Sequence, residues 1–595
     1  MVRLRFDVDL AGVDRRLLAL RLLVDELDAA PGPLGGDRDS VEFSMPVWTP
    51  GSYLVREYSR HLRSLRAEDG AGNPLACHKS AKNRWRVARP LDGRLILHWQ
   101  IYARDLSVRT AYTNGEFAFW NGACTYLWPV GAEALPAEIA VRLPPGWSLA
   151  AGSLPVADET GPLARFSVQD QDEAVDQPCL AGRLATFELE LDGCPHRFVE
   201  VGREGIPMPE SFRGDVLAVL RASAAVFGGA LPFERYTFLS LFAERGRGGL
   251  EHRDSSTLLA PRTTFAPRAA YEDYLALIAH EYLHAWNVKR MRPREFWSYD
   301  LERENHTSLL WVAEGFTAYL DDLLCLRAGS MTPRRYLGRL ASHVDAMHAN
   351  PGRFRQSLAE ASFDAWLLLY RPDESTRNAT QNYYTNGALA AFVIDAAIRR
   401  ASAGQRCLDD ALRELWRTTY VQGRGYDHAD VCRAISVAAG EPLEALVDSL
   451  TLRSFEPDLD GALALFGLRL EFEDEAGLRL GVRLDAQRST IASVQEGSPA
   501  ERAGLAPGDE ILALDRLRVQ AENFDAIWSF RAVEGRPVRV LVAREGALRD
   551  FEVVPERGKR GGKARIVAAA VADQAQLAQR RAWLGASSLG GGTAD

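Results

Sequence analysis

The sequence predicts a multidomain α+β protein, because the spacing of its apolar residues changes along a chain of 595 residues. Up to about residue 195, apolar and polar residues alternate in short segments, as they do in half-buried strands. From about 196 to 456, apolar residues recur with the period of amphipathic helices. A chain of this length exceeds what one hydrophobic core usually supports, so we expect several domains.

A β-sandwich-like domain is expected at residues 1–195. Its alternating segments, such as 94–101 and 185–191, are separated by clusters of Pro, Gly and Asp that favour turns. The domain also contains the string Pro-Val-Trp-Thr-Pro-Gly-Ser-Tyr at 46–53. Taken alone, this string indicates a Pro-Gly turn with aromatic residues packed beneath it.

The second domain is expected at 196–456, with long helices at 271–290, 308–327, 333–350 and 386–400. After it, the string Gly-Ser-Pro-Ala-Glu-Arg-Ala-Gly-Leu-Ala-Pro-Gly-Asp-Glu-Ile-Leu at 497–512 resembles a bacterial PDZ domain, which we place at 457–556. Residues 557–595 are expected to form a basic linker, a helix ending near Gly585 and a disordered Gly-rich tail at 587–595.

In such a PDZ domain, the loop Leu480-Gly481-Val482 would form the peptide groove. Its backbone N–H groups would bind the carboxylate of a C-terminal peptide tail, which would add to the sheet as a strand. A partner's tail is therefore a possible ligand of this domain.

The charge and hydropathy of the chain exclude two classes of partner. A formal net charge of −9 gives no electrostatic reason to approach nucleic acid or an anionic membrane. No stretch approaches the roughly 18 apolar residues needed to span a bilayer. We expect neither nucleic acid nor membrane as a partner.

A cytoplasmic location is expected from the chain's start and from its cysteines. Asp7 and Asp9 interrupt the first apolar stretch, so no export signal is seen. The seven cysteines are scattered and lack Cys-x-x-Cys spacing, which favours reduced thiols. A chain from which a leader had been removed would look the same, and the expected location would then be periplasmic.

The motif His280-Glu281-Tyr282-Leu283-His284 lies within an apolar helical stretch. Residues four apart on a helix lie about 40° apart around the axis, so both imidazoles project from one face and can share a metal ion. Zinc suits two imidazoles and one carboxylate, with a fourth position for a water molecule. We therefore expect one Zn²⁺ per chain, against the alternative of two ordinary surface histidines.

Glu281 is expected to act as the general base. It is rotated by about 100° from His280, so it can reach the metal's open position without being a ligand. A carboxylate at that position can take a proton from the attacking water.

The third ligand has two main candidates. Glu304 follows His284 by twenty residues, a spacing used by thermolysin-like enzymes, but its stretch is charged and indicates a solvated loop. Glu314 stands alone among apolar neighbours, and a buried carboxylate needs a cationic partner. We predict Glu314, with His306 as a further candidate; a metzincin site is excluded because Arg290 stands where its third histidine is required.

Several of these strings together resemble the glycyl aminopeptidase family of gluzincin zinc metallopeptidases. In chain order, they are the Trp-Thr-Pro-Gly-Ser-Tyr string, the residues 280–290, the stretch 311–319 and the PDZ-like segment. The resemblance covers nearly the whole chain. It implies a β-rich N-terminal domain, a thermolysin-like zinc peptidase domain with a helical C-terminal part, and a PDZ domain.

The resemblance also implies a substrate-binding segment at Gly248-Gly249-Leu250-Glu251-His252. In related aminopeptidases the glutamate of this segment binds the free α-ammonium of the substrate. Glu251 would have that role here, with Gly248, Gly249 and His252 around it. The alternative is a Gly-Gly turn followed by an exposed ion pair.

An oxyanion donor is implied by the segment Asn-Tyr-Tyr-Thr-Asn-Gly at 382–387, which is similar to the family's Tyr-x-x-Gly segment. By that match Tyr384 is the donor and Tyr383 the substitute. A phenol with an ordinary pKa near 10 stays protonated at neutral pH and can stabilise an oxyanion. Alternatively, both are core tyrosines at the start of a helix.

One position departs from the thermolysin pattern. Ala318 stands four residues after Glu314, where an acid could orient a histidine, so Asp321 or Asp322 would have to replace it.

These interpretations predict a zinc-dependent aminopeptidase that releases small N-terminal residues, Gly or Ala, from peptides with a free N-terminus. Two alternatives stay open. One is a zinc endopeptidase that captures substrates with its PDZ domain. The other is a peptide-binding PDZ scaffold with a non-catalytic metal site.

Overall fold

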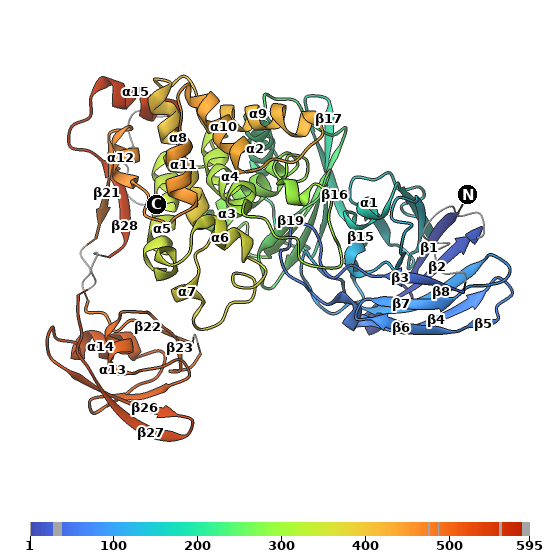
Figure 1. Cartoon of the computed structure of the whole chain (residues 1–595), viewed down its shortest axis with the longest axis horizontal. Helices are drawn as coiled ribbons and strands as arrows, with labels where there is room; N and C mark the ends of the chain where they lie inside the picture. Colours follow the sequence, from blue (N-terminus) through green and yellow to red (C-terminus); the bar gives the residue numbers. More distant parts are fainter. Residues whose placement is uncertain (1, 28–38, 474–476, 486, 558–561, 586–595) are drawn as a thin grey trace. The chain divides into compact units, whose positions relative to one another are not determined.

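The computed structural model describes residues 2–27, 39–473, 477–485, 487–557 and 562–585. Two compact units are present (Figure 1). The first consists of Met1–Asn305, Arg327–Ser330 and Thr419–Tyr426, and the second of His306–Leu326, Met331–Thr418 and Asp427–Asp595. The expected tail at 587–595 and the linker residues 558–561 lie outside the described residues.

The first unit begins with three sheets that enclose an apolar core. They run in the orders β14-β12-β1-β2-β8-β4-β5, β13-β15-β10-β9 and β11-β3-β7-β6, and all strand pairs except β1 with β12 are antiparallel. The strands are β1 (Arg3–Asp9), β2 (Leu17–Asp25), β3 (Ser40–Ser44), β4 (Leu62–Asp69), β5 (Pro74–Leu75), β6 (Cys77–Ala81), β7 (Arg84–Ala88), β8 (Leu95–Tyr102), β9 (Tyr112–Thr113), β10 (Phe117–Asn121), β11 (Trp128–Pro129), β12 (Ala137–Arg142), β13 (Ser148–Ala151), β14 (Leu163–Val168) and β15 (Pro178–Gly182). Alternate residues of β2 are buried, as the sequence pattern predicts.

A five-stranded sheet follows in the same unit, in the order β16-β17-β18-β20-β19. Its strands are β16 (Ala185–Leu191), β17 (Cys194–Val201), β18 (Tyr236–Ala243), β19 (Gly248–Glu251) and β20 (Ser255–Pro261). Strands β17, β18 and β20 are parallel, while β19 is an antiparallel edge strand. Every residue of β18 is buried, which is usual for the centre of a parallel sheet.

Helix α3 (Arg268–Leu283) packs against this sheet and against α2 (Phe212–Val226), and the short α1 (Gln171–Val175) precedes β15. Two buried hydrogen bonds tie α3 to the strands. Tyr282 Oη lies 2.8 Å from His196 Nε2, and Tyr274 Oη lies 3.0 Å from Ser240 Oγ. The edge strand β19 also contacts α3. The helix that carries the predicted metal motif is therefore fixed on a rigid sheet.

Helix α3 ends at Leu283, earlier than the expected 290. His284 keeps right-handed helical dihedral angles as its C-cap, so His280 and His284 remain one turn apart. Beyond it, the amides of Val288 and Lys289 both donate to the carbonyl of His284, which closes tight turns in place of further α-helix.

The helices of the second unit lie close to the expected positions, with η7 and α4 replacing one helix at 308–327. They are the π-helix η7 (Trp311–Gly315), α4 (Phe316–Arg327), α5 (Pro333–His348), α6 (Leu358–Phe363), α7 (Thr376–Ala379), α8 (Thr385–Ala401), α9 (Leu408–Thr418), α10 (His428–Ala439), α11 (Glu444–Thr451) and α12 (Leu459–Ala464). Helix α8 is central, since it contacts η7, α5, α9, α10, α11 and α12.

Two glycines let η7 and α8 approach backbone to backbone. A Cβ on Gly387 would lie 2.8 Å from Gly315 Cα and 3.2 Å from the carbonyl oxygen of Trp311. Both distances are shorter than ordinary van der Waals contact, and both neighbours are backbone atoms. A side chain at position 387 would therefore push the two backbones apart. Gly387 is the glycine of the predicted Tyr-x-x-Gly segment, so the spacing has a packing reason.

The PDZ-like segment has its own apolar core within the second unit. Its elements are β22 (Val482–Leu484), β23 (Ile491–Val494), α13 (Pro499–Ala503), β24 (Glu510–Leu514), β25 (Leu517–Arg518), α14 (Phe524–Arg531), β26 (Val538–Arg544) and β27 (Ala547–Val553). On either side of it, β21 (Leu468–Phe472) and β28 (Ala564–Ala568) pair antiparallel. Helix α15 (Gln574–Leu584) then packs Trp583 on Phe466, with ring centroids 4.3 Å apart.

The expected multidomain α+β organisation is confirmed, with a sheet-rich N-terminal region and a helical middle part. In the part of the chain that the structure describes, no helix is both long enough and apolar enough to cross a bilayer.

We expect Gly387→Ala to lower stability by about 1–3 kcal/mol, because the added methyl group overpacks the η7–α8 contact. Gly338→Ala is the matched control. Gly338 is an exposed helical glycine of α5 whose Cβ would meet nothing within 4 Å, so alanine should stabilise by about 0.5–1 kcal/mol. The midpoint of thermal unfolding measures both; an unchanged midpoint for Gly387→Ala would contradict the packing argument.

Candidate functional site

His280 and His284 lie together at the end of α3. Their ring centroids are 4.7 Å apart, with the ring planes nearly perpendicular. His284 is buried, and its Nδ1 lies 2.6 Å from the carbonyl oxygen of Asn287. Because a carbonyl can only accept, Nδ1 carries the proton, and Nε2 presents the lone pair that a metal ligand needs.

The group that orients His284 is therefore a backbone carbonyl of the same turn. The sequence suggested Asp321 or Asp322 as an acid that orients a histidine, without saying which histidine, and this stays a prediction. In the second unit, Asp322 accepts a hydrogen bond from Arg339 Nε at 2.7 Å. A carbonyl has no side-chain signature, so residue types alone could not reveal it.

The carboxylate of Glu281 is buried beside the edge strand β19. A Cβ on Gly249 would lie 2.1 Å from Glu281 Oε1. A larger residue at this position would displace the Glu281 carboxylate from its place beside the strand. Gly248 begins β19. Among the described residues, a Cβ added to Gly248 would have one neighbouring atom within 4 Å, Arg109 Nη1 at 3.8 Å.

Glu251 ends β19 and is also buried, with 3% of its surface exposed, so it is not the exposed ion pair that was the alternative. Among the described residues its Oε1 has no hydrogen-bond partner. Carboxylate oxygens of Glu251 and Glu281 and a ring nitrogen of His284 all lie within 4.8 Å of one another. Two buried carboxylates this close fit a bound cation, because a nearby positive charge offsets the cost of burying them.

The turn at 46–53 packs directly against Glu251. Gly51 adopts a positive φ of 87°, and a Cβ there would lie 2.5 Å from Glu251 Oε1. The turn itself is anchored by Trp48 Nε1, which donates to the carbonyl of Asp300 at 2.8 Å. The sequence predicts a turn here but not its contact with Glu251. The Pro-Gly pair within the motif string is the feature that could have indicated a close approach.

A buried ion network supports the segment that holds Glu251. Asp176 accepts from Lys289 Nζ at 2.6 Å and lies 3.3 Å from His252 Nδ1. Although burial opposes ionisation, the charges of Lys289 and His252 hold the pKa of Asp176 well below its usual value. The charges of Asp176 and, more weakly, Glu251 raise the pKa of Lys289 despite its burial. His252 thus faces Asp176.

Glu304 and His306, the other candidates for the third metal ligand, lie in environments that do not resemble a metal site. Within the first unit, Glu304 belongs to no described cluster of possible metal ligands with His280 and His284. Its neighbour Glu302 forms an ion pair with Arg84 at 2.7 Å. In the second unit, His306 Nδ1 lies 2.8 Å from the carbonyl oxygen of Phe363, and the two rings stack.

Glu314 lies in the second unit, on the π-helix η7, and is 2% exposed. Single π-helical turns inside helices occur frequently at functional sites. The backbone contact between Gly315 and Gly387 brings the start of α8 beside η7. This close approach places the predicted tyrosines near Glu314.

Tyr383 and Tyr384 stack at the N-terminus of α8, with ring centroids 4.7 Å apart. Burial, and then the charges of Tyr370 and Glu314, raise the pKa of the fully buried Tyr383 well above its ordinary value. The half-buried Tyr384 has its hydroxyl 2.9 Å from that of Tyr370. The Tyr384 hydroxyl thus has a partner, whereas the buried Tyr383 hydroxyl has no hydrogen-bond partner among the described residues.

The predicted PDZ groove residues have different environments. Leu480 is in the PDZ core, whereas Gly481 and Val482 line a cavity of about 980 Å³ in the second unit. Gly481 has a positive φ of 87°, and a Cβ there would meet Ser498. Across the same cavity, Asn378 Nδ2 donates to the carbonyl of Val494 at 2.8 Å.

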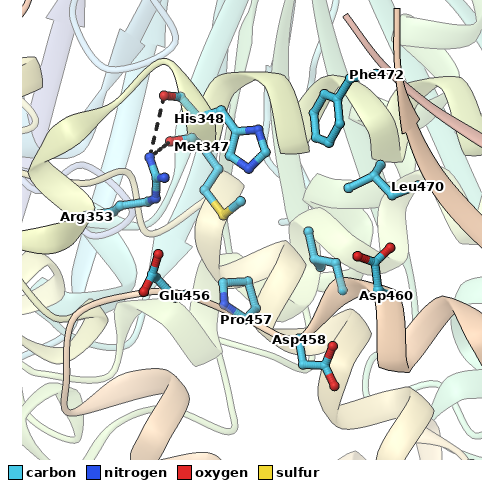
Figure 2. Close-up of a pocket in the computed structure, with 10 residues that line it drawn as sticks. Met347, His348, Arg353, Glu456, Pro457, Asp458, Asp460, Leu470 and Phe472 are labelled. Carbon is cyan, nitrogen blue, oxygen red and sulfur yellow. Dashed lines mark hydrogen bonds between the residues drawn. The ribbon is translucent and has the colours of Figure 1, made fainter. Parts of the chain in front are cut away.

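A second cavity of the same unit, about 400 Å³, contains none of the predicted site residues (Figure 2). Its wall includes Met347, His348 and Phe472. Arg353 Nη1 donates to the carbonyls of Met347 and His348 at 2.8 and 3.5 Å. This guanidinium therefore satisfies backbone carbonyls at the end of α5.

Comparison with protein families gives three matches in chain order. They are the peptidase M61 N-terminal domain at residues 5–183, M61 glycyl aminopeptidase at 273–390, and a PDZ domain at 490–544. The middle match contains His280, Glu281, His284, Glu314 and Tyr384. No curated protein matches the chain.

Solved structures give a whole-chain likeness. An aminopeptidase N family protein from Idiomarina loihiensis is 28% identical, with a TM-score of 0.88, and the match covers 98% of this chain and 100% of the other. An M1 zinc metallopeptidase from Deinococcus radiodurans, solved with a Tyr-Ser-Ala substrate, is 17% identical, with a TM-score of 0.48 and 77% and 94% coverage. The M61 and PDZ matches in chain order, together with the first of these structures, make the chain similar to M61 glycyl aminopeptidases.

Proposed function

We propose that this peptidase is a zinc-dependent aminopeptidase that removes one small N-terminal residue, Gly or Ala, from peptides. The observation that carries the proposal is the buried cluster of Glu251, Glu281 and His284 in the first unit. Glu251 is suited to the ammonium group of a substrate, and Glu281 is suited to take a proton from the water that attacks beside the metal ion.

His280, His284 and Glu314 are the proposed ligands of one zinc ion. The tautomer set by Asn287, which leaves Nε2 of His284 to bind, supports this assignment. So do the burial of Glu314 and the separation of Glu304 from any described ligand cluster. When bound there, zinc supplies a Lewis acid that lowers the pKa of water and polarises the scissile carbonyl.

Glu281 is the proposed general base. Its carboxylate accepts a proton from the attacking water and then delivers that proton to the nitrogen of the departing amine. The contact with Gly249 supports this role, because it holds the carboxylate against β19. A fixed carboxylate loses little freedom when the reaction begins.

Glu251 is the proposed binding group for the substrate's α-ammonium, with Gly248, Gly249 and His252 forming the surrounding segment. Its buried Oε1 without a partner among the described residues supports the role. A buried carboxylate that lacks a cation rejects substrates with a blocked N-terminus, since those leave its charge unpaired. The Gly51 turn limits the space beside it.

Tyr384 is the proposed oxyanion donor, with its hydroxyl oriented by Tyr370. A neutral phenol donates a hydrogen bond that strengthens as negative charge develops on the carbonyl oxygen. Tyr383 is the substitute candidate, supported by its electrostatic contact with Glu314.

A peptide-capturing role for the PDZ domain is the second candidate function. The cavity lined by Gly481 and Val482 supports it, because backbone groups there could receive a peptide end. This role is compatible with either an aminopeptidase or an endopeptidase. A scaffold without catalysis would require that the chain hydrolyse no peptide.

We expect Glu281→Gln to lower kcat for glycyl and alanyl p-nitroanilides by about 10²–10⁴-fold, because the base is lost while the metal ligands remain. Asp273→Asn on the same helix is the matched control and should be as active as the wild type. Chelation should abolish hydrolysis, and added zinc should restore it. Hydrolysis that survives both the chelator and Glu281→Gln would refute the mechanism.

Glu251→Gln should lower kcat/KM for free peptides by at least about 30-fold, as expected when one partner of a buried charge pair is removed. The exposed Glu244→Gln serves as the control. The wild type should cut N-acetylated peptides far more slowly than free ones. Equal rates on both by the wild type would instead identify an endopeptidase.

For the oxyanion donor, Tyr384→Phe is expected to reduce kcat by about 10²–10³-fold with little change in KM. Tyr383→Phe, which keeps the stacked ring, should retain most activity. Steady-state kinetics on alanyl p-nitroanilide decide between them, and the reverse pattern would transfer the role to Tyr383.

A further inference from the structure

The first turn of α10 and the neighbouring α11, both in the second unit (Figure 1), bring together a histidine, a cysteine and an aspartate. We propose that His428, Cys432 and Asp448 form a second transition-metal site, of the zinc type, that joins α10 to α11. The site shares no residue with the proposed catalytic centre and does not depend on the proposed function.

Geometry carries the proposal. His428 and Cys432 are four residues apart on α10 and so project from one face. His428 Nε2 lies 2.8 Å from Asp448 Oδ1 and 3.4 Å from Cys432 Sγ. All three ligand-type atoms lie within 4.8 Å of one another. One imidazole nitrogen thus faces both a thiol and a carboxylate.

These separations are close to those around a tetrahedral ion. Zinc–ligand bonds of about 2.0–2.3 Å would place neighbouring ligand atoms roughly 3.4–3.6 Å apart. The sulfur–nitrogen distance already has this value. The nitrogen–oxygen distance of 2.8 Å would have to open by roughly 0.6 Å. A rotation of Asp448, whose side chain is 46% exposed, can supply that change.

The surroundings of the thiol favour a cation. The negative charges of Asp448, Glu444 and Asp427 act on the thiol of Cys432. On binding, the S–H bond breaks, a sulfur–metal bond forms and the proton passes to solvent, so the charges balance. Water or the exposed Glu444, one turn before Asp448, can complete the coordination.

The donor set also indicates which ion would bind. Thiolate, imidazole and carboxylate together suit zinc and cobalt, whereas magnesium and calcium prefer oxygen ligands alone. Without a metal, His428 and Asp448 make only a partly exposed polar contact. A metal would fix the eight-residue α11 to α10 far more firmly.

Cobalt absorption tests the site in the metal-free full-length chain. A thiolate bound to Co²⁺ gives a near-ultraviolet charge-transfer band, to which the sulfur-free proposed catalytic ligands contribute nothing. We expect the band to saturate by about two equivalents of cobalt, because the proposed catalytic ligands also take up the ion, and to disappear when zinc is added. It should be absent in Cys432→Ser and unchanged in the control Cys407→Ser. Asp448→Asn should weaken the affinity for cobalt by at least about tenfold.

Three outcomes would overturn the proposal. They are no band in excess cobalt, a band that persists in Cys432→Ser, or unchanged cobalt affinity in Asp448→Asn. Circular dichroism checks that each variant folds. If Cys432→Ser does not fold, Asp448→Asn and His428→Gln carry the test, since both replace partly exposed side chains.

Discussion

The burial of negative charge beside α3 is the constraint on which the first unit depends. Glu251 and Glu281 lie almost fully inside the protein, close to His284. Carboxylates in a medium of low polarity are stable only with a cation nearby. The bonds from Tyr274 and Tyr282 to the sheet hold the helix rigid enough to keep these charges together. A site of this kind is organised before any ligand arrives.

Close contacts made possible by glycine occur in both units, with a side chain in the first and between two backbones in the second. In the first unit Gly249 lets β19 run against Glu281, and in the second Gly315 and Gly387 let η7 touch α8. Each contact sets the position of an acidic or phenolic side chain on one of the two elements. A larger residue would displace the Glu281 side chain in the first unit and force the backbones of η7 and α8 apart in the second, so these glycines act on the site through packing.

The PDZ-like segment is connected to the helical part at both of its ends. Strands β21 and β28 pair with each other on either side of it, and Trp583 of α15 then stacks on Phe466. Its own core is separate from the helical core. A domain tethered by paired strands has less orientational freedom than one at the end of a flexible linker. That restriction is useful if the domain presents peptides.

The sequence alone determined the α+β organisation, the helix that carries His280 and His284, and the peptidase family, because these follow from local periodicity and from residues close together in the chain. The tertiary structure alone decided that Gly51 abuts Glu251 and that Asn287 orients His284. It also decided that β21 pairs with β28 and that Cys432 faces His428 and Asp448. Most of these contacts join residues far apart in the chain or use backbone atoms. Neither long-range contacts nor backbone contacts can be inferred from residue spacing and side-chain type.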